Sequence, residues 1–362
     1  MRKFVITTAA VAGVALMALS GCSTRSDSTS GDAAGFDADS VIGVALPDKT
    51  SENWVLAGKL FEDGLAEAGF TADVQYAPAS NTVPEQQNQI TSMITKGAKV
   101  VVIGAKDGAQ LGSQVKAAKD AGAAVIAYDR LILNTESVDY YVAYDNEKVG
   151  ELQGQALLDG MKAKYPNATT YNIELFAGSP DDANAQVFFD GAMKVLQPKI
   201  ADGTLKVLSG QTDFKQVVTQ GWLAQNAQTR MDTLLAANYS TAELNGVLSP
   251  NDTLARAILT SVNAAGKAYP IVTGQDSEVE SVKSIMAGIQ YSTINKDTVK
   301  LVAHTIEMIK DLSNGTTPET NSTDYDNGKK VVPTYLLPPE LVTKENAAES
   351  YKGNATLEPL TK

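Results

Sequence analysis

The chain has 362 residues, of which 43% are hydrophobic and 20% charged, with a formal net charge of −12. This length suits two ordinary domains with apolar cores of their own. The acidic balance argues against nucleic-acid binding, which needs basic surfaces, and against electrostatic adhesion to anionic lipid. Cys22 is the only cysteine, so no intrachain disulfide can form.

The N-terminus has the layout of a secretory signal. Two basic residues precede an apolar run over residues 4–19, which leads into Ser-Gly before Cys22. The sequence Leu-Ser-Gly-Cys resembles a bacterial lipobox, which predicts removal of residues 1–21 and lipidation of Cys22. The alternative is a signal peptide without lipidation and a chance cysteine. Either interpretation predicts a protein that works outside the cytoplasm.

Beyond Cys22, residues 22–39 contain almost nothing apolar, and we expect a flexible tether there. From residue 40 on, short apolar runs alternate with amphipathic stretches. Residues 41–46 form a β-branched run that predicts a buried strand. A helix with Thr50 or Ser51 as its N-cap should follow and end at Gly69.

The same alternation continues to residue 312. Further strands are predicted at residues 99–103, 123–127, 140–143, 171–176, 205–208, 246–248, 271–273 and 290–294. Helices are predicted at residues 84–97, 111–121, 148–162, 185–196, 225–237, 253–264, 279–287 and 298–312. This β-α repetition predicts an α/β fold of parallel sheets with helices on both faces.

One strand–turn–helix–strand pattern occurs twice, from Val100 to Asp129 and from Gly246 to Asp276. Each copy ends in an aspartate at the carboxyl end of its last strand, where open α/β sheets bind ligands. The repetition indicates two similar lobes that each offer a carboxylate to a shared cleft. The alternative is that aspartate is simply common in the turn that ends such a unit.

Seven short motifs in a fixed order carry a family resemblance. They are Lys-Gly-Ala-Lys-Val-Val-Val-Ile at 96–103, Ala-Tyr-Asp-Arg-Leu-Ile at 127–132, Tyr-Asp-Asn-Glu-Lys-Val-Gly-Glu-Leu-Gln at 144–153, Gly-Ser-Pro-Asp-Asp-Ala-Asn-Ala at 178–185, Leu-Ser-Pro-Asn-Asp at 248–252, Thr-Gly-Gln-Asp at 273–276, and Tyr-Asp-Asn-Gly followed by Val-Val-Pro within 325–333. Together they resemble the sugar-binding lipoproteins of ABC transporters, in particular the xylose- and multiple-monosaccharide-binding periplasmic proteins.

The resemblance implies a type I periplasmic binding fold, with two Rossmann-like lobes that close on a sugar by a hinge motion. The three crossings between lobes are expected near residues 144–146, 293–296 and 324–328. The implied domains are a first lobe of residues 40–145 and 297–325, a second lobe of residues 146–296 and 326–340, and a C-terminal tail over residues 341–362. The implied protein is a monomer without enzymatic activity, cofactor or metal, and its closed form is recognised by a membrane permease.

A sugar site must replace the hydration bonds of every hydroxyl it buries. Carboxylates accept such bonds strongly, Arg and Lys donate them, and aromatic rings cover the C–H faces. The resemblance implies that Trp54 and Trp222 stack on opposite faces of the sugar. The other contacts that it implies are Asp129, Arg130, Asp182, Asn184, Asn251, Asp276 and Lys296.

These residues also have plainer interpretations. Asp129 and Arg130 could instead form a surface ion pair, and Lys296 could be a lysine on the hinge surface. Each tryptophan could instead belong to the apolar core. Helix capping competes for Asp182, Asn184 and Asn251. At residues 251–252 the motif favours ligand contact by Asn251 and capping by Asp252.

One position departs from the family pattern. The xylose-type proteins commonly have arginine just before the first tryptophan, where this chain has Asn53. Asn53 can donate and accept but has no charge and less reach. We expect it to contact the sugar, with partial compensation from Lys49. The departure leaves the preferred sugar open.

The sequence therefore predicts a lipid-anchored receptor for a neutral aldopyranose such as xylose, glucose or galactose that delivers it to an ABC permease. A sensor that docks on a chemoreceptor or histidine-kinase ectodomain would have the same sequence features. An extracellular glycoside-processing enzyme would turn its sugar over. The sugar-binding core of a repressor would need a helix-turn-helix where the secretory signal stands.

Overall fold

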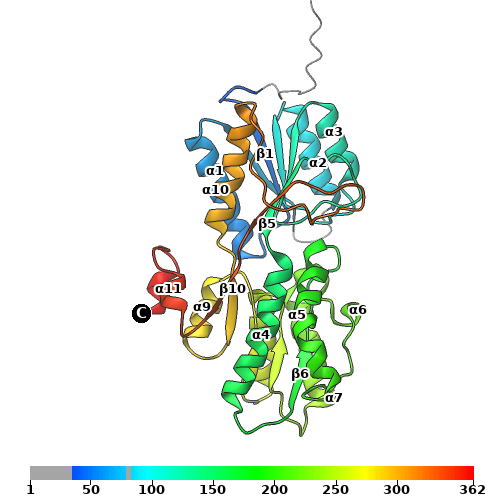
Figure 1. Ribbon diagram of the computed structural model, residues 1–362, viewed down its shortest axis with the longest axis vertical. Coiled ribbons are helices and arrows are strands. Elements are labelled where there is room, and N and C mark those ends of the chain that lie inside the picture. The colour runs from blue at the N-terminus through cyan, green and yellow to red at the C-terminus, as the bar shows by residue number, and fades with distance from the viewer. Residues whose placement is uncertain (1–34, 79–82) are drawn as a thin grey trace, which may run out of the picture.

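The computed structural model describes residues 35–78 and 83–362 and forms two lobes (Figure 1). The predicted signal peptide, Cys22 and most of the predicted tether lie outside the described residues. Within the described part of the chain, no helix is both long enough and apolar enough to span a membrane.

The first lobe is a parallel sheet with the strand order β11-β5-β4-β3-β1-β2. Helices α2 and α3 pack on one face, and α1 and α10 pack on the other. Its central strands are apolar throughout because both faces are covered. The strands are β1 (Val41–Leu46), β2 (Thr71–Tyr76), β3 (Val100–Ile103), β4 (Ala124–Tyr128), β5 (Tyr140–Tyr144) and β11 (Thr334–Leu337). The helices are α1 (Glu52–Glu67), α2 (Val83–Thr95), α3 (Gly112–Asp120) and α10 (Thr298–Ser313).

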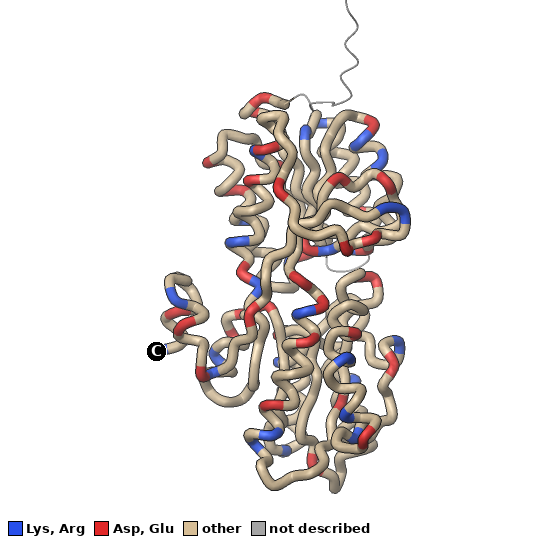
Figure 2. The backbone as a smooth tube through the Cα atoms, in the orientation of Figure 1, with Lys and Arg blue, Asp and Glu red and all other residues tan. Residues whose placement is uncertain are grey.

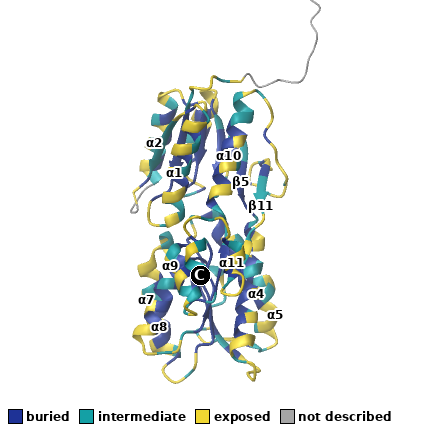
Figure 3. Cartoon of the chain, turned by 90° about the vertical axis from the view of Figure 1, so that its left-hand side faces the viewer, coloured by how far each residue is buried: buried dark blue, intermediate teal, exposed yellow. Residues whose placement is uncertain are grey.

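The second lobe has a parallel sheet with the order β7-β6-β8-β9. Helices α4 and α5 cover one face, and α7 and α8 cover the other. The buried strands lie between helices whose outer sides are exposed, as in the first lobe (Figure 3). The elements are β6 (Tyr171–Leu175), β7 (Leu205–Val207), β8 (Gly246–Leu248), β9 (Ile271–Val272), α4 (Asn146–Lys164), α5 (Ala183–Ala201), α6 (Phe214–Val217), the 3₁₀ turn η1 (Gln220–Trp222), α7 (Ala224–Asn238) and α8 (Asp252–Ala264).

A small unit attached to the second lobe completes the fold. An antiparallel pair of strands, β10 (Ser292–Asn295) and β12 (Glu340–Thr343), lies beside α9 (Val279–Met286), α11 (Ala347–Ser350) and the 3₁₀ turn η2 (Glu358–Thr361). These elements share their own apolar cluster, which consists of Val282, Val342, Ala347, Tyr351 and Leu357.

Three segments cross between the lobes: Asp145 between β5 and α4, residues 296–297 between β10 and α10, and residues 338–339 between β11 and β12. The first two agree with the expected crossings. The third was expected at 324–328 and lies about ten residues later. The reason is that β11 hydrogen-bonds in parallel to β5, with Thr334 opposite Tyr141.

The expected domain bounds therefore need two changes. Residues 326–337 lie with the first lobe rather than the second, because β11 is the edge strand of the first sheet. Residues 341–362 are not a tail, because β12 pairs with β10 and Tyr351 is buried against α9.

Every strand and helix predicted from the alternating pattern is present, with bounds that differ by a few residues. Parallel sheets with helices on both faces are confirmed. Strand β2 was missed because it is an edge strand with half-buried side chains and a polar sequence, Thr-Ala-Asp-Val-Gln-Tyr. Its composition therefore lacks the apolar run of a central strand.

Tyr351 provides a test of whether the C-terminal segment belongs to the folded core. Its side chain is 1% exposed, and its hydroxyl donates to Ser277 Oγ at 2.7 Å. Tyr351→Ala should lower the free energy of unfolding by about 3–5 kcal/mol, because it leaves a cavity and an unpaired serine. Urea denaturation followed by circular dichroism measures this. The exposed neighbour gives the control Lys352→Ala, and equal midpoints for the two variants would contradict the packing.

Candidate ligand-binding site between the lobes

A cavity of about 910 Å³, part of it open to solvent, lies between the lobes and is lined by residues of both. Many lining residues follow the carboxyl ends of strands, as expected for open α/β sheets. Ten of the eleven residues predicted for the site line this cavity: Asn53, Trp54, Asp129, Arg130, Asp182, Asn184, Trp222, Asn251, Asp276 and Lys296.

Asp129 and Asp276 occupy equivalent places in the two lobes. Each follows a strand, and each backbone N–H donates to the next strand, Asp129 to Val142 O at 2.8 Å and Asp276 to Ile294 O at 2.9 Å. Both have left-handed backbones, with φ of 61° and 96°. Such conformations cost about 1–3 kcal/mol for residues other than glycine and collect at functional sites. Both aspartates line the cavity from these positions beyond their strands.

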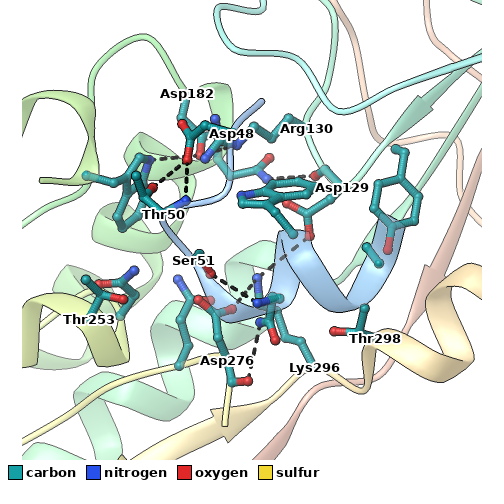
Figure 4. Close-up of a pocket in the computed structure, with 18 of the residues that line it drawn as sticks. Asp48, Thr50, Ser51, Asp129, Arg130, Asp182, Thr253, Asp276, Lys296 and Thr298 are labelled. Carbon is teal, nitrogen blue, oxygen red and sulfur yellow. Dashed lines mark hydrogen bonds and ion pairs between the residues drawn. The ribbon is translucent and has the colours of Figure 1, made fainter. Parts of the chain in front are cut away.

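Lys296 joins the two carboxylates (Figure 4). Its Nζ lies 3.0 Å from Asp276 Oδ1 and 3.8 Å from Asp129 Oδ2, and its side chain is 9% exposed. Burial alone would lower the pKa of Lys296, but Asp276 and Asp129 outweigh burial and raise it. The ammonium is therefore charged at neutral pH. Lys296 lies in the second crossing segment, so it can reach both lobes.

A second ion pair crosses the cavity. Arg130 Nε of the first lobe lies 2.9 Å from Asp182 Oδ2 of the second, and the Trp222 indole donates to the same oxygen at 3.2 Å. The other oxygen of Asp182 accepts from Asn184 N, so this residue also caps α5. Burial raises the pKa of Asp182, and the Arg130 guanidinium reduces that shift. Asp182 therefore both caps α5 and lines the cavity.

The two asparagines also have structural contacts. Asn184 Nδ2 donates across the lobes to Asp129 O at 2.7 Å. Asn251 Oδ1 caps α8 by accepting from Leu254 N at 3.0 Å, and among the described residues its Nδ2 donates to no partner. The amide of Asn251 is therefore available to the cavity while its carbonyl oxygen is used by the helix.

Each indole that lines the cavity lies against a glycine. A Cβ added to Gly104, just after β3, would lie 3.1 Å from the Trp54 ring, and one added to Gly178 would lie 2.1 Å from the Trp222 ring. The two tryptophans come from opposite lobes, on α1 and η1. A side chain at Gly178 would therefore clash with the Trp222 ring, and one at Gly104 would crowd the Trp54 ring.

Asn53 lies in the cavity wall, whereas Lys49 lies outside it. Asn53 lines the cavity, but its Nδ2 donates to Asp276 O at 3.3 Å and so joins the lobes. Lys49 does not line the cavity; its Nζ lies 4.5 Å from the centre of the Tyr76 ring. Lys49 is therefore not placed to compensate for the missing arginine.

Sequence reasoning missed a third ion pair in the cavity wall, Lys106 Nζ with Asp48 Oδ2 at 2.6 Å. Burial would raise the pKa of Asp48, but hydrogen bonds from Lys106 and Thr50 outweigh it and lower the pKa. Both charged residues follow strands, β1 and β3, so the rule that identified Asp129 would have found them. Phe188, whose ring centre lies 5.5 Å from Lys296 Nζ, gave no signal because it occupies a core-like position in α5.

The lining side chains include five carboxylates and three cations. Each cation is paired with a carboxylate of the same cavity. Acidic residues are also spread over both lobes (Figure 2). The cavity offers charged donors and acceptors at short range without excess positive charge, which suits a neutral polar ligand and opposes an anion. No group of three or more His, Cys, Asp or Glu side chains suited to a metal occurs among the described residues.

Asp252 does not cap α8, contrary to the expectation. Asn251 is the N-cap, and Asp252 points into the second lobe, fully buried. Its carboxylate accepts from Glu278 N, Thr293 Oγ1 and Gln290 Nε2 at 2.8–3.0 Å. Burial and the nearby charges of Glu278 and Asp276 raise the pKa of Asp252 well above its usual value.

This raised pKa makes Asp252→Asn a test of the buried network. The raised pKa of Asp252 lowers the free energy of unfolding as the pH rises above 3.8, because the unfolded state releases the proton at a lower pH than the folded state does. The asparagine does not titrate, and its Oδ1 can still accept from Glu278 N and Thr293 Oγ1. At pH 7 the variant should be more stable by about 1–2 kcal/mol, and the difference should vanish toward pH 4. Urea midpoints across this range measure it, with exposed Asp232→Asn as control; a difference independent of pH would contradict the assignment.

Comparisons with known proteins agree with this architecture. The periplasmic binding protein domain family matches residues 42–317. The chain is 49% identical over 311 residues to the multiple sugar-binding periplasmic receptor ChvE of Rhizobium radiobacter, covering 84% of this chain and 87% of that one. It is 36% identical to the D-xylose-binding periplasmic protein of Escherichia coli, covering 85% and 88%. An ABC transporter solute-binding protein of Clostridium phytofermentans superposes with a TM-score of 0.84 at 38% identity, over 89% of this chain and 100% of that one. The chain therefore belongs to the periplasmic binding protein family.

Proposed function

We propose that this protein captures a neutral monosaccharide, an aldopyranose of the xylose, glucose or galactose class, and delivers it to an ABC permease. The observation that carries the proposal is the cavity itself: paired charges from both lobes, two indoles and no excess positive charge. Relatives support it, since their names give multiple sugars and D-xylose as ligands. The Clostridium structure contains β-D-glucose, and a related one from Chloroflexus aurantiacus contains D-glucose.

The polar residues divide the sugar hydroxyls among them. Asp129 and Asp276 accept hydrogen bonds, Arg130 and Lys296 donate them, and Asn251 donates through its free amide. A carboxylate already bonded to a cation keeps lone pairs for hydroxyl protons. Trp54 and Trp222 cover the C–H faces of the ring. Asp182 and Asn184 act mainly by holding Arg130, Trp222 and the backbone of Asp129 in place.

Binding is coupled to lobe closure in this proposal. Three crossing segments allow bending but resist sliding. A sugar that contacts both lobes has higher affinity for the closed arrangement than for an open one, and this difference drives closure. The permease would then recognise the closed shape.

The same geometry supports binding without turnover. A glycosidase needs one carboxyl group free to donate a proton and another free to attack or to activate water. Here Asp129, Asp182 and Asp276 are each held in an ion pair. We further propose that Cys22 carries a lipid that anchors the protein outside the cytoplasm; mass spectrometry of membrane-extracted protein tests this.

Asp276→Asn tests the site with little change of backbone, because Asn tolerates the left-handed conformation. The substitution removes a charged acceptor and should weaken sugar binding by about 1.5–3 kcal/mol, or roughly 10- to 150-fold. Isothermal titration calorimetry with D-glucose, D-xylose and D-galactose measures this. Asp232→Asn, the same change on the exposed side of α7, is the control. Unchanged affinity in Asp276→Asn would remove this carboxylate from the site.

The indole pair predicts a spectroscopic response. Trp54→Phe and Trp222→Phe each leave one tryptophan, and the emission of the remaining indole should change in both variants when sugar saturates the site, because each ring loses water contact to the ligand. Fluorescence titration at sugar concentrations shown by calorimetry to saturate each variant measures it. A silent indole in either variant would refute its place on the sugar.

A further inference from the structure

The first turn of α1 contacts the start of α9 across the lobes. Glu52 Oε2 accepts a hydrogen bond from the backbone N–H of Val279 at 2.9 Å. Its neighbour Ser51 donates through Oγ to Glu278 Oε1 at 3.2 Å. With the Asn53 contact to Asp276 O, three consecutive residues of the first lobe bind one turn of the second.

Glu52 differs from its two neighbours because it does not line the cavity and its side chain is exposed. Val279 is the first residue of α9, and the first N–H groups of a helix have no acceptor within it. Glu278, the N-cap residue, makes no side-chain cap bond. Its carboxylate pairs with Arg256 at 2.7 Å instead. Glu52 therefore caps α9 from the opposite lobe, where a negative charge also interacts favourably with the helix dipole.

The turn that Glu52 contacts is held firmly within the second lobe. Asp276 and Ser277 have left-handed backbones, with φ of 96° and 53°. Tyr351 fixes Ser277 through its hydroxyl at 2.7 Å, and Thr253 holds Glu278 at 2.8 Å. The acceptor on α1 and the donor on α9 belong to different lobes. Their hydrogen bond therefore exists only when the lobes lie together.

We infer that Glu52 is a positioning residue for sugar retention: it stabilises the closed arrangement by capping α9 across the cleft and does not touch the sugar. The inference rests on the proposed function. A contact that forms after the sugar has entered slows escape more than it speeds capture. Its loss should therefore raise the dissociation rate and leave the association rate unchanged.

The test uses Glu52→Ala and Glu52→Asp. The aspartate keeps the negative charge in the first turn of α1 but is one methylene too short to hold the 2.9 Å contact. Glu62→Ala, an exposed residue of the same helix, is the matched control. Stopped-flow tryptophan fluorescence with D-glucose, D-xylose and D-galactose gives both rate constants, and thermal melting without sugar reports on the fold.

Both Glu52 variants should release sugar about 2- to 10-fold faster than the control, which is the effect expected from losing one hydrogen bond at a helix terminus. Their association rates and their melting temperatures without sugar should equal those of Glu62→Ala. Dissociation rates equal to the control would overturn the inference and leave the proposed function intact. A lower sugar-free melting temperature in both variants would also overturn it, because Glu52 would then stabilise the fold rather than closure. Failure of the wild type to bind any of the three sugars would instead refute the proposed function, and the inference with it.

Discussion

One buried ammonium makes it possible for the two lobes to meet. Asp129 and Asp276 come from separate sheets, and two carboxylates brought together out of water repel each other. Lys296 lies between them at 3.8 and 3.0 Å and supplies the compensating charge. It can do so because it belongs to a crossing segment. Removing the ammonium would leave two like charges facing each other across the cleft.

The remaining side chains of the cavity are held in place before any ligand contact is considered. Asp182 fixes the Arg130 guanidinium and the Trp222 indole, and Lys106 is tied to Asp48. Glycines next to both indoles leave room for the rings near the strand ends. A site whose side chains are already ordered loses little conformational entropy on binding. The same pairing cancels the cationic charge that a phosphorylated or carboxylated ligand would need.

Much of this could be predicted from the sequence, because parallel α/β sheets follow simple rules. Alternating apolar runs identified the strands, and the repeated unit identified Asp129 and Asp276 as equivalent residues at strand ends. Lys296 and the tryptophans were implied only by family resemblance, since no local pattern shows which loop residues converge from distant parts of a chain.

The misses have physical causes. The position of β11 depends on its hydrogen bonding to β5. This pairing cannot be predicted from the sequence, because β11 is a short strand that follows a long irregular segment. Lys49 lies near the site residues in sequence, but its ammonium packs over the Tyr76 ring. A long lysine side chain has many rotamers, so its contacts cannot be predicted from its position in the sequence. Asp252 was expected to cap α8, but its carboxylate instead accepts hydrogen bonds from buried donors inside the second lobe. The same residue type, aspartate, can cap a helix or lie buried in the core, and only the tertiary contacts decide between the two.

The most direct test of a neutral-sugar site between compensated charges is calorimetric titration of the wild-type protein with D-glucose and D-glucose 6-phosphate, alongside D-xylose and D-galactose. We expect one-to-one saturable binding of at least one neutral aldopyranose and no heat from the phosphorylated sugar. Binding of the phosphorylated sugar in preference to all neutral ones, or no binding of any neutral sugar, would contradict it.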